Sequence, residues 1–146
     1  MRGSENLSSS RSLEIVIKSG PPDRPKVAAA IQQLARKHQL PDRVVQAADL
    51  ALEEYLSNLT TYSFVGRPEH EIKIRFTIGS DLLIEVEDDG PPFNPLTVSP
   101  VDTGAPLDTR PIGGLGVHLM RDFMDGLEYS TVAGRNILRM RKRLKP

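Results

Sequence analysis

The sequence predicts an α+β fold, a two-layer α/β sandwich in which a mixed, mostly antiparallel sheet is covered on one face by three helices. Three observations predict it. The expected elements run strand, helix, helix, strand, strand, loop, helix, strand, strand, so the helices are segregated from most of the strands. Short turns join most of the strands as hairpins, which pair antiparallel. The 146 residues suffice for one domain with its own core, but not for two.

The first half of the domain follows a polar, serine-rich segment, 1–11, which we expect to be disordered. The domain itself is therefore assigned to 12–146. Alternation of apolar and polar residues predicts a strand over 13–18. Asp23 is placed to cap a helix over 26–39.

The helix expected over 41–62 gives the strongest periodic signal in the chain. Pro41 stands in the first turn, where a helix tolerates proline. The apolar stripe of this helix consists of Ala48, Leu52, Tyr55 and Leu59. The remaining elements are strands over 71–78 and 81–88, a long loop over 94–113, a helix over 114–125, and strands over 126–132 and 136–143.

Charge and composition narrow the classes of function. Lysine plus arginine and aspartate plus glutamate each number 19, so no net field favours a nucleic acid or an anionic membrane as partner. The absence of cysteine excludes disulfides and thiolate-ligated metals. No apolar run approaches the ~20 residues of a membrane span, and no segment is typical of a signal peptide, so we expect a cytoplasmic location.

The segment VEDDGPPFNP, residues 86–95, ends an expected strand with acidic residues and prolines. Strand side chains alternate between faces, so Asp88 falls on the apolar face of Ile84 and Val86. A carboxylate there needs a hydrogen-bond donor, which could be a helix N-terminus, a water or a ligand such as an adenine amine. Gly90 leaves room for a ligand beside the backbone. The alternative is a turn in which Asp88 caps a neighbouring amide.

Two polar residues lie one turn apart near the end of the helix expected over 41–62. Glu54 and Asn58 share one helix face at the border of the apolar stripe, so both can reach the edge of a cleft. A glutamate can orient or deprotonate a hydroxyl group, and an asparagine oxygen can bind a hard cation such as Mg²⁺. The simpler alternative is a solvated helix edge.

Glycines gather at the expected start of the helix over 114–125. The run GGLG, residues 113–116, exposes backbone N–H groups at a helix N-terminus, which favours a phosphate. The run lacks the Lys-Ser/Thr ending of a Walker A sequence and does not follow a strand as a dinucleotide fingerprint does. An ordinary glycine-rich helix start is the alternative.

In this order, the three segments resemble the motifs of the GHKL-type (histidine kinase-like) ATPases. ALEEYLSN (51–58) looks like the N-box, VEDDGPPF (86–93) like the first glycine box and GGLGVHLM (113–120) like the second, with 94–112 in place of the ATP lid. The short chain and the segments DDGPPFNP and RPIGGLGVHLMRDFMD are most similar to bacterial anti-sigma-factor serine/threonine kinases. The resemblance covers 12–143 and implies the Bergerat-type ATP-binding sandwich.

The resemblance also implies a role for each matching position. Glu54 would be the general base or the residue that orients the hydroxyl, and Asn58 would hold Mg²⁺ at the phosphates of ATP. Asp88 would accept a hydrogen bond from the adenine amine. The other nucleotide contacts that it implies are Gly90, Phe93, Gly114, Leu115 and Gly116.

The implied function is an ATP- and Mg²⁺-dependent serine/threonine kinase that regulates a sigma factor by phosphorylating a STAS-type anti-anti-sigma protein. We also expect a homodimer, and no direct nucleic-acid or membrane partner. The chain departs from the family pattern at Pro92 and Ile112, where glycines are usual, and at 59–62, where many relatives carry a basic residue or a histidine. The alternative function is a nucleotide-gated protein-binding switch without phosphoryl transfer.

Overall fold

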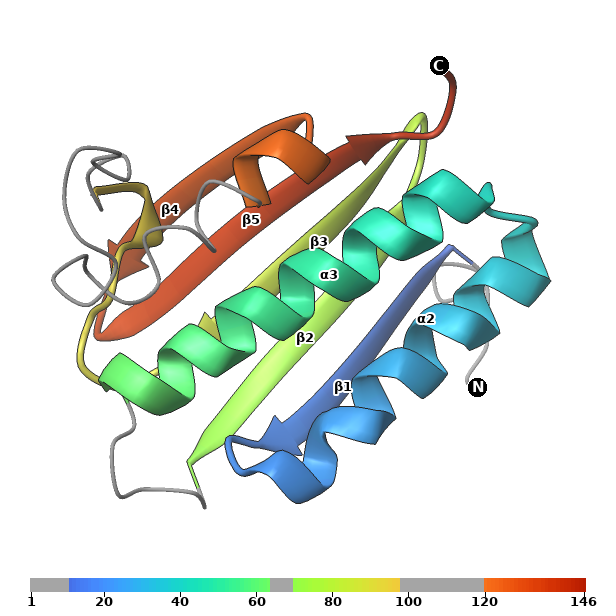
Figure 1. The fold of residues 1–146 in the computed structure, drawn as a ribbon. Coiled ribbons are helices and arrows are strands. Elements are labelled where there is room, and N and C mark those ends of the chain that lie inside the picture. The colour runs from blue at the N-terminus through green and yellow to red at the C-terminus, as the bar shows by residue number, and fades with distance from the viewer. Residues whose placement is uncertain (1–10, 64–69, 98–119) are drawn as a thin grey trace, which may run out of the picture.

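The computed structural model describes residues 11–63, 70–97 and 120–146. One layer is a sheet and the other consists of helices that cover one face of it (Figure 1). The strands are β1 (Ser12–Lys18), β2 (Glu71–Ile78), β3 (Asp81–Asp88), β4 (Gly126–Val132) and β5 (Arg135–Arg143). The helices are α2 (Arg24–His38), α3 (Asp42–Asn58) and a short helical segment at 120–123. The predicted two-layer α+β sandwich is confirmed.

The sheet has five strands in the order β1-β2-β3-β5-β4. Each pairing among these described strands is antiparallel, so the parallel component allowed by a mixed sheet is not found in this part of the chain. The strand that comes last in the sequence, β5, lies between β3 and β4. Residues 136–141 of β5 therefore pair with β3 on one side and with β4 on the other.

The core lies between the sheet and the helices. On β2 and β3, every second side chain points toward the helices and is at most 4% exposed. The inward residues of these two strands are Ile72, Ile74, Phe76, Ile78, Leu82, Ile84 and Val86. The apolar stripe of α3 packs against them, and each fully buried Leu, Ile, Val or Phe side chain contributes roughly 1.5–3 kcal/mol. This alternation extends to Asp88, which is also buried.

The opposite face of the sheet carries charged side chains in register. Arg75 on β2 donates from Nε to Glu14 on β1 at 3.1 Å, and its Nη1 lies 3.6 Å from Glu85 on β3. Arg139 on β5 donates from Nε to the same Glu85 at 2.9 Å. Oppositely charged residues thus alternate along one row across four strands, and each exposed pair is worth only about 0.2–1 kcal/mol.

The structure corrects three predicted details of the helices. The α-helix predicted to 62 ends at Asn58 and continues as a wider π-helical turn, Leu59–Ser63. The reason is local, because the Thr60 hydroxyl lies 3.0 Å from the Leu56 carbonyl oxygen and offers that acceptor an alternative donor. Of the helix predicted over 114–125, the structure describes residues 120–125, and only 120–123 of these are helical.

The third correction concerns Asp23, which precedes α2 but makes no side-chain cap. Its carboxylate instead accepts a hydrogen bond from the backbone N–H of Lys18 at 2.6 Å, which chiefly lowers its pKa. Asp23 therefore ties the end of β1 to the start of the helix layer.

Several predictions fall outside the described residues. These are the disorder of 1–10, most of the loop over 94–113, and the glycine run with Gly114, Leu115 and Gly116. Within the described ranges, no helix is both long enough and apolar enough to cross a membrane.

Candidate functional site

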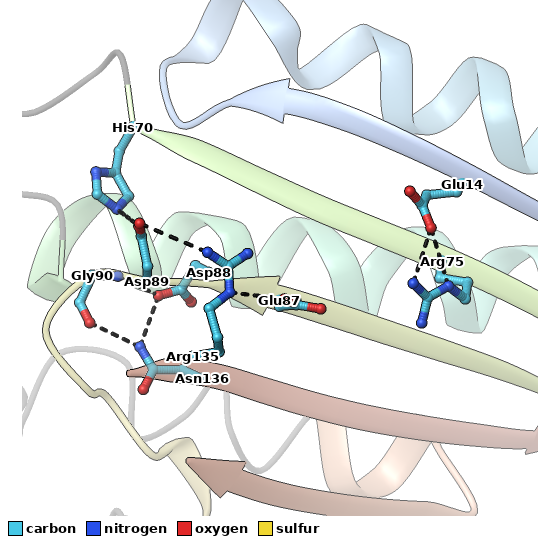
Figure 2. Close-up of polar contacts among 9 residues, drawn as sticks. All are labelled: Glu14, His70, Arg75, Glu87, Asp88, Asp89, Gly90, Arg135 and Asn136. Atoms are coloured by element: carbon cyan, nitrogen blue, oxygen red, sulfur yellow. Dashed lines mark hydrogen bonds and ion pairs between the residues drawn. The ribbon is translucent and has the colours of Figure 1, made fainter. Parts of the chain in front are cut away.

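The site is built around Asp88, at the end of β3 and on the helix-covered face of the sheet. Its carboxylate is buried, at 1% exposure. Oδ1 accepts two hydrogen bonds, from the Gly90 backbone N–H at 2.9 Å and from Asn136 Nδ2 at 2.8 Å (Figure 2). Oδ2 is also buried, and no residue in the described part of the chain donates to it. Oδ1 of Asp88 therefore caps the turn that follows β3, and Oδ2 can accept a hydrogen bond from a further donor.

Asn136, which the sequence reasoning missed, holds this arrangement together. Its Nδ2 donates to Asp88 Oδ1 and also to the Gly90 carbonyl oxygen, both at 2.8 Å. The side chain is 2% exposed and lies directly opposite Asp88 in the register of β3 and β5. The alternation of strand side chains could have indicated Asn136, because it is a polar residue on the same face as Leu138 and Met140. Its pairing with Asp88 depends on the strand order, which the sequence does not give.

Burial raises the pKa of Asp88 above its ordinary value. The hydrogen bonds from Asn136 and Gly90 and the nearby His70 act in the opposite direction but do not outweigh it. A further N–H donor at Oδ2 would favour the ionised form. A ligand that supplies such a donor therefore gains more here than at an exposed carboxylate.

Tyr55 brings a second buried polar group to this region from α3. Its side chain is fully buried, and its hydroxyl has no partner among the described residues. Burial, followed by the charge of Asp88, raises the pKa of Tyr55 far above its ordinary value. The sequence assigned Tyr55 only to the apolar stripe, whereas the structure also sets its hydroxyl in the field of Asp88.

Asn58 and Glu54 lie near the end of α3. Asn58 is 3% exposed, and its Nδ2 is buried without a partner in the parts of the chain described. Glu54, one turn earlier, is half-buried. Asn58 was predicted at the border of the apolar stripe, but its side chain is more deeply buried than that position implies. The alternative of a solvated helix edge therefore does not hold for Asn58.

These residues come together because three elements meet at one end of the molecule. Figure 1 shows the C-terminal ends of α3 and β3 beside the start of β5. Phe93, just beyond the turn, is partly buried and packs against the core. The structure thus gathers Asn58, Asp88, Gly90 and Phe93 in one region, while Gly114, Leu115 and Gly116 lie outside the described residues.

The described residues offer few metal ligands. Over the described ranges, no three His, Cys, Asp or Glu side chains are grouped so as to hold a metal ion. The amide oxygen of Asn58 is one group that could hold a cation. Mg²⁺ commonly keeps several waters and takes its other ligands from substrate phosphates. A single protein oxygen therefore fits a magnesium ion that arrives with a nucleotide better than a resident metal.

Comparison with known proteins adds independent findings. Residues 18–142 match the family model described as the histidine kinase-like ATPase domain. The serine/threonine-protein kinase BtrW of Bordetella bronchiseptica is 25% identical over 119 residues, which make up 80% of this chain and 82% of BtrW.

Two solved structures share the fold. The RsbU and RsbW domains of Rv1364c from Mycobacterium tuberculosis match with a TM-score of 0.63 and 12% identity, over 91% of this chain and 32% of that chain. The histidine kinase domain of a blue-light activated histidine kinase from Erythrobacter litoralis EL346 matches with a TM-score of 0.50 and 18% identity, over 88% of this chain and 62% of that one. This chain thus spans about a third of the first structure and under two thirds of the second.

Proposed function

Because the chain belongs to the family of histidine kinase-like ATPase domains, we propose that it binds ATP with Mg²⁺ and phosphorylates a serine or threonine of a partner protein. The observation that carries nucleotide binding is Asp88 Oδ2, which is buried and lacks a donor among the described residues. Buried polar atoms in native structures generally have partners. An exocyclic amine such as that of adenine is a donor of the missing kind. The similarity to a serine/threonine-protein kinase supports a protein as the acceptor.

Asn58 is the residue that we propose for the metal. Its amide oxygen would be one ligand of Mg²⁺, and the bound ion would neutralise phosphate charge. The amide nitrogen of Asn58 can contribute as well, because Nδ2 has no partner among the described residues and can donate to a phosphate oxygen or a water. This arrangement needs no further protein carboxylate at the ion.

Glu54 is the residue that we propose for proton transfer. A serine or threonine hydroxyl that attacks the γ-phosphorus must lose its proton, and the Glu54 carboxylate would accept it. The new bond joins the hydroxyl oxygen to phosphorus, and the bond to the departing ADP oxygen breaks. The half-buried position of Glu54 leaves it accessible to such a hydroxyl. Positioning and charge neutralisation supply most of the rate in this chemistry.

We propose a STAS-type anti-anti-sigma protein as the acceptor and a sigma factor as the regulated partner. The support is the resemblance of residues 88–95 and 110–125 to anti-sigma-factor kinases. A homodimer is part of the same proposal, and light scattering on the purified protein would check it.

A nucleotide-gated switch without phosphoryl transfer is the second candidate, and one observation favours it. Thr60 stands in the segment after Asn58 where many relatives carry a basic residue. Its hydroxyl accepts from Arg24 Nη2 at 3.3 Å and lies within hydrogen-bond distance of the carbonyl oxygens of Ser19 and Leu56. Thr60 is therefore engaged in joining α3 to the end of β1 rather than being available to a phosphate.

Transfer of label from Mg-[γ-³²P]ATP separates the candidates. The wild-type protein is incubated with STAS-type proteins from the same genome, and Glu54→Gln serves as the matched control. Labelled serine or threonine on a partner, lost in Glu54→Gln, supports the kinase. Nucleotide-dependent binding of a partner without label supports the switch. Absence of ATP binding by calorimetry at millimolar nucleotide contradicts both.

A further inference from the structure

Two consecutive residues of β5 hold the turn at Asp88 from opposite faces of the sheet. Asn136 holds it from the helix-covered face, as described above. Arg135 holds it from the open face: its Nε donates to Glu87 Oε2 at 2.8 Å, and its Nη1 lies 3.8 Å from Asp89 Oδ2. Figure 2 shows both sets of contacts converging on the end of β3. The two residues that flank Asp88 in the chain are thus bound to a single guanidinium group.

Asp89 has a second contact on the same face. The imidazole Nε2 of His70, which directly precedes β2, lies 2.5 Å from Asp89 Oδ1 (Figure 2). Asp89 therefore connects three strands: it follows β3, and its carboxylate faces His70 beside β2 and Arg135 at the start of β5. We call Glu87, Asp89, Arg135 and His70 the outer cluster.

The β4–β5 hairpin fixes the position of Arg135. Val132 and Arg135 are paired, and only Ala133 and Gly134 lie between them. Both of these residues have positive φ, 53° and 79°, as a two-residue turn of type I′ requires. Since this turn sets the register of β5, Arg135 and Asn136 reach the end of β3 together.

The outer cluster contributes little to stability by itself. The side chains of Arg135, Glu87 and Asp89 are 42%, 22% and 52% exposed, and ion pairs at such exposure are worth about 0.2–1 kcal/mol. Its geometric effect is larger. Asp88 Oδ2 can meet a donor only if the backbone on both sides of Asp88 keeps its direction, and the outer cluster holds that backbone at both neighbours.

We propose that Arg135 is a positioning residue for base recognition, acting through Glu87 and Asp89 on the carboxylate of Asp88. The inference rests on the proposed nucleotide binding and adds to it a residue on the face of the sheet that no base would touch. Pre-organisation of a site raises affinity by removing the cost of ordering it at the moment of binding. Arg135 would thereby set both the affinity for ATP and the preference for ATP over GTP.

The chain provides a matched control on the same strand. Arg139 lies on the same face of β5, four residues after Arg135, and donates from Nε to Glu85 Oε2 at 2.9 Å, a contact of the same type as the Arg135–Glu87 pair. Its side chain is 35% exposed, close to the exposure of Arg135. Arg139→Ala therefore removes a similar ion pair without touching the turn.

The test measures ATP and GTP affinities by calorimetry, and the melting temperature of the free protein, for Arg135→Ala, Arg135→Lys, Asp89→Asn and Arg139→Ala. Arg135→Ala and Asp89→Asn should each weaken ATP binding by roughly three- to tenfold and lower the ATP/GTP ratio. The double variant Arg135→Ala/Asp89→Asn should lose less than the product of the two single losses, because the residues share one interaction. Arg135→Lys should lose less ATP affinity than Arg135→Ala, because lysine keeps the positive charge but not the planar set of N–H donors of the guanidinium group. Arg139→Ala should bind ATP within about twofold of the wild type.

Two outcomes would overturn the inference while leaving nucleotide binding intact. In the first, Arg135→Ala and Asp89→Asn keep the ATP/GTP affinity ratio of the wild type, and their melting temperatures fall as much as that of Arg139→Ala. The outer cluster would then only stabilise the fold. The other is an equal loss of ATP affinity in Arg139→Ala. If Arg135→Ala does not fold, Asp89→Asn alone decides, because that exposed residue changes without loss of volume. A wild type that binds no nucleotide would instead overturn the proposed function.

Discussion

Replacing Asp88 by asparagine tests base recognition at Oδ2, the carboxylate oxygen to which no described residue donates. The donors at Oδ1, from Gly90 and Asn136, would orient the new amide so that its oxygen takes the place of Oδ1. The amide nitrogen then replaces Oδ2. An acceptor becomes a donor, and it faces the amine of adenine.

The magnitude follows from the lost interaction. A charge-assisted hydrogen bond contributes about 1.5–3 kcal/mol, and each 1.4 kcal/mol corresponds to roughly a factor of ten. Asp88→Asn should therefore weaken ATP binding by about 10- to 100-fold. GTP should lose far less, because guanine carries a carbonyl oxygen where adenine carries its amine, and the new amide can donate to it. Calorimetry with both nucleotides gives the ratio directly.

The pH dependence of stability gives a second measurement on the same variant. Burial raises the pKa of Asp88 in the folded protein. The stability that this group contributes is complete below its unfolded pKa and is lost as the pH rises through the folded pKa. As the pH rises above about 3.8, the ordinary pKa of aspartate, the free energy of unfolding of the wild type should therefore fall relative to that of Asp88→Asn. An unchanged ATP/GTP ratio together with a pH-independent loss of stability would refute the base-reading role and leave Asp88 as a turn cap.

Three further predictions each concern a single residue. Glu54→Ala should leave ATP affinity within a few-fold of wild type but lower phosphoryl transfer by roughly 10²-fold, the usual worth of a positioned base; equal losses of binding and transfer in a radiolabel assay would make Glu54 structural. Asn58→Ala should abolish the gain in ATP affinity on adding Mg²⁺, measured by calorimetry with and without EDTA, and a persisting gain would place the ion elsewhere. Ala133→Asn should raise the free energy of unfolding in urea by about 0.5–1 kcal/mol, because asparagine tolerates positive φ better than alanine; a decrease would contradict the turn type.

Local patterns predicted much of this fold and part of the site. Alternation predicted β2 and β3 with the bounds that the structure gives, and the same alternation placed Asp88 on the buried face. The family resemblance read from the three motifs is confirmed. The roles assigned to Glu54 and Asn58 stay predictions.

The missed features depend on side-chain contacts that the local pattern of apolar and polar residues does not give. Asn136 meets Asp88 across 48 positions of sequence, and nothing local to either residue indicates that pairing. Asp23 was expected to cap the helix that follows it, but the free N–H of Lys18 at the end of β1 is the donor that it meets. The helix over 41–62 was predicted too long because its apolar stripe continues, whereas the side chain of Thr60 competes for the backbone. Asn136 and Asp23 each meet a partner on another element, whereas the Thr60 contact lies within a single helical turn.

The position of β5 has a consequence for the order in which the contacts around Asp88 form during folding. β5 follows all the other elements in sequence, yet it is an inner strand of the sheet. The earlier segments can form β1, β2, β3 and both long helices through contacts of their own. Until the β4–β5 hairpin pairs with β3, however, the Asp88 carboxylate lacks Asn136. Long-range pairings of this kind form slowly, and chains fold from the N-terminus during synthesis. Under the proposed function, the chain would therefore bind a nucleotide only after β5 is in place.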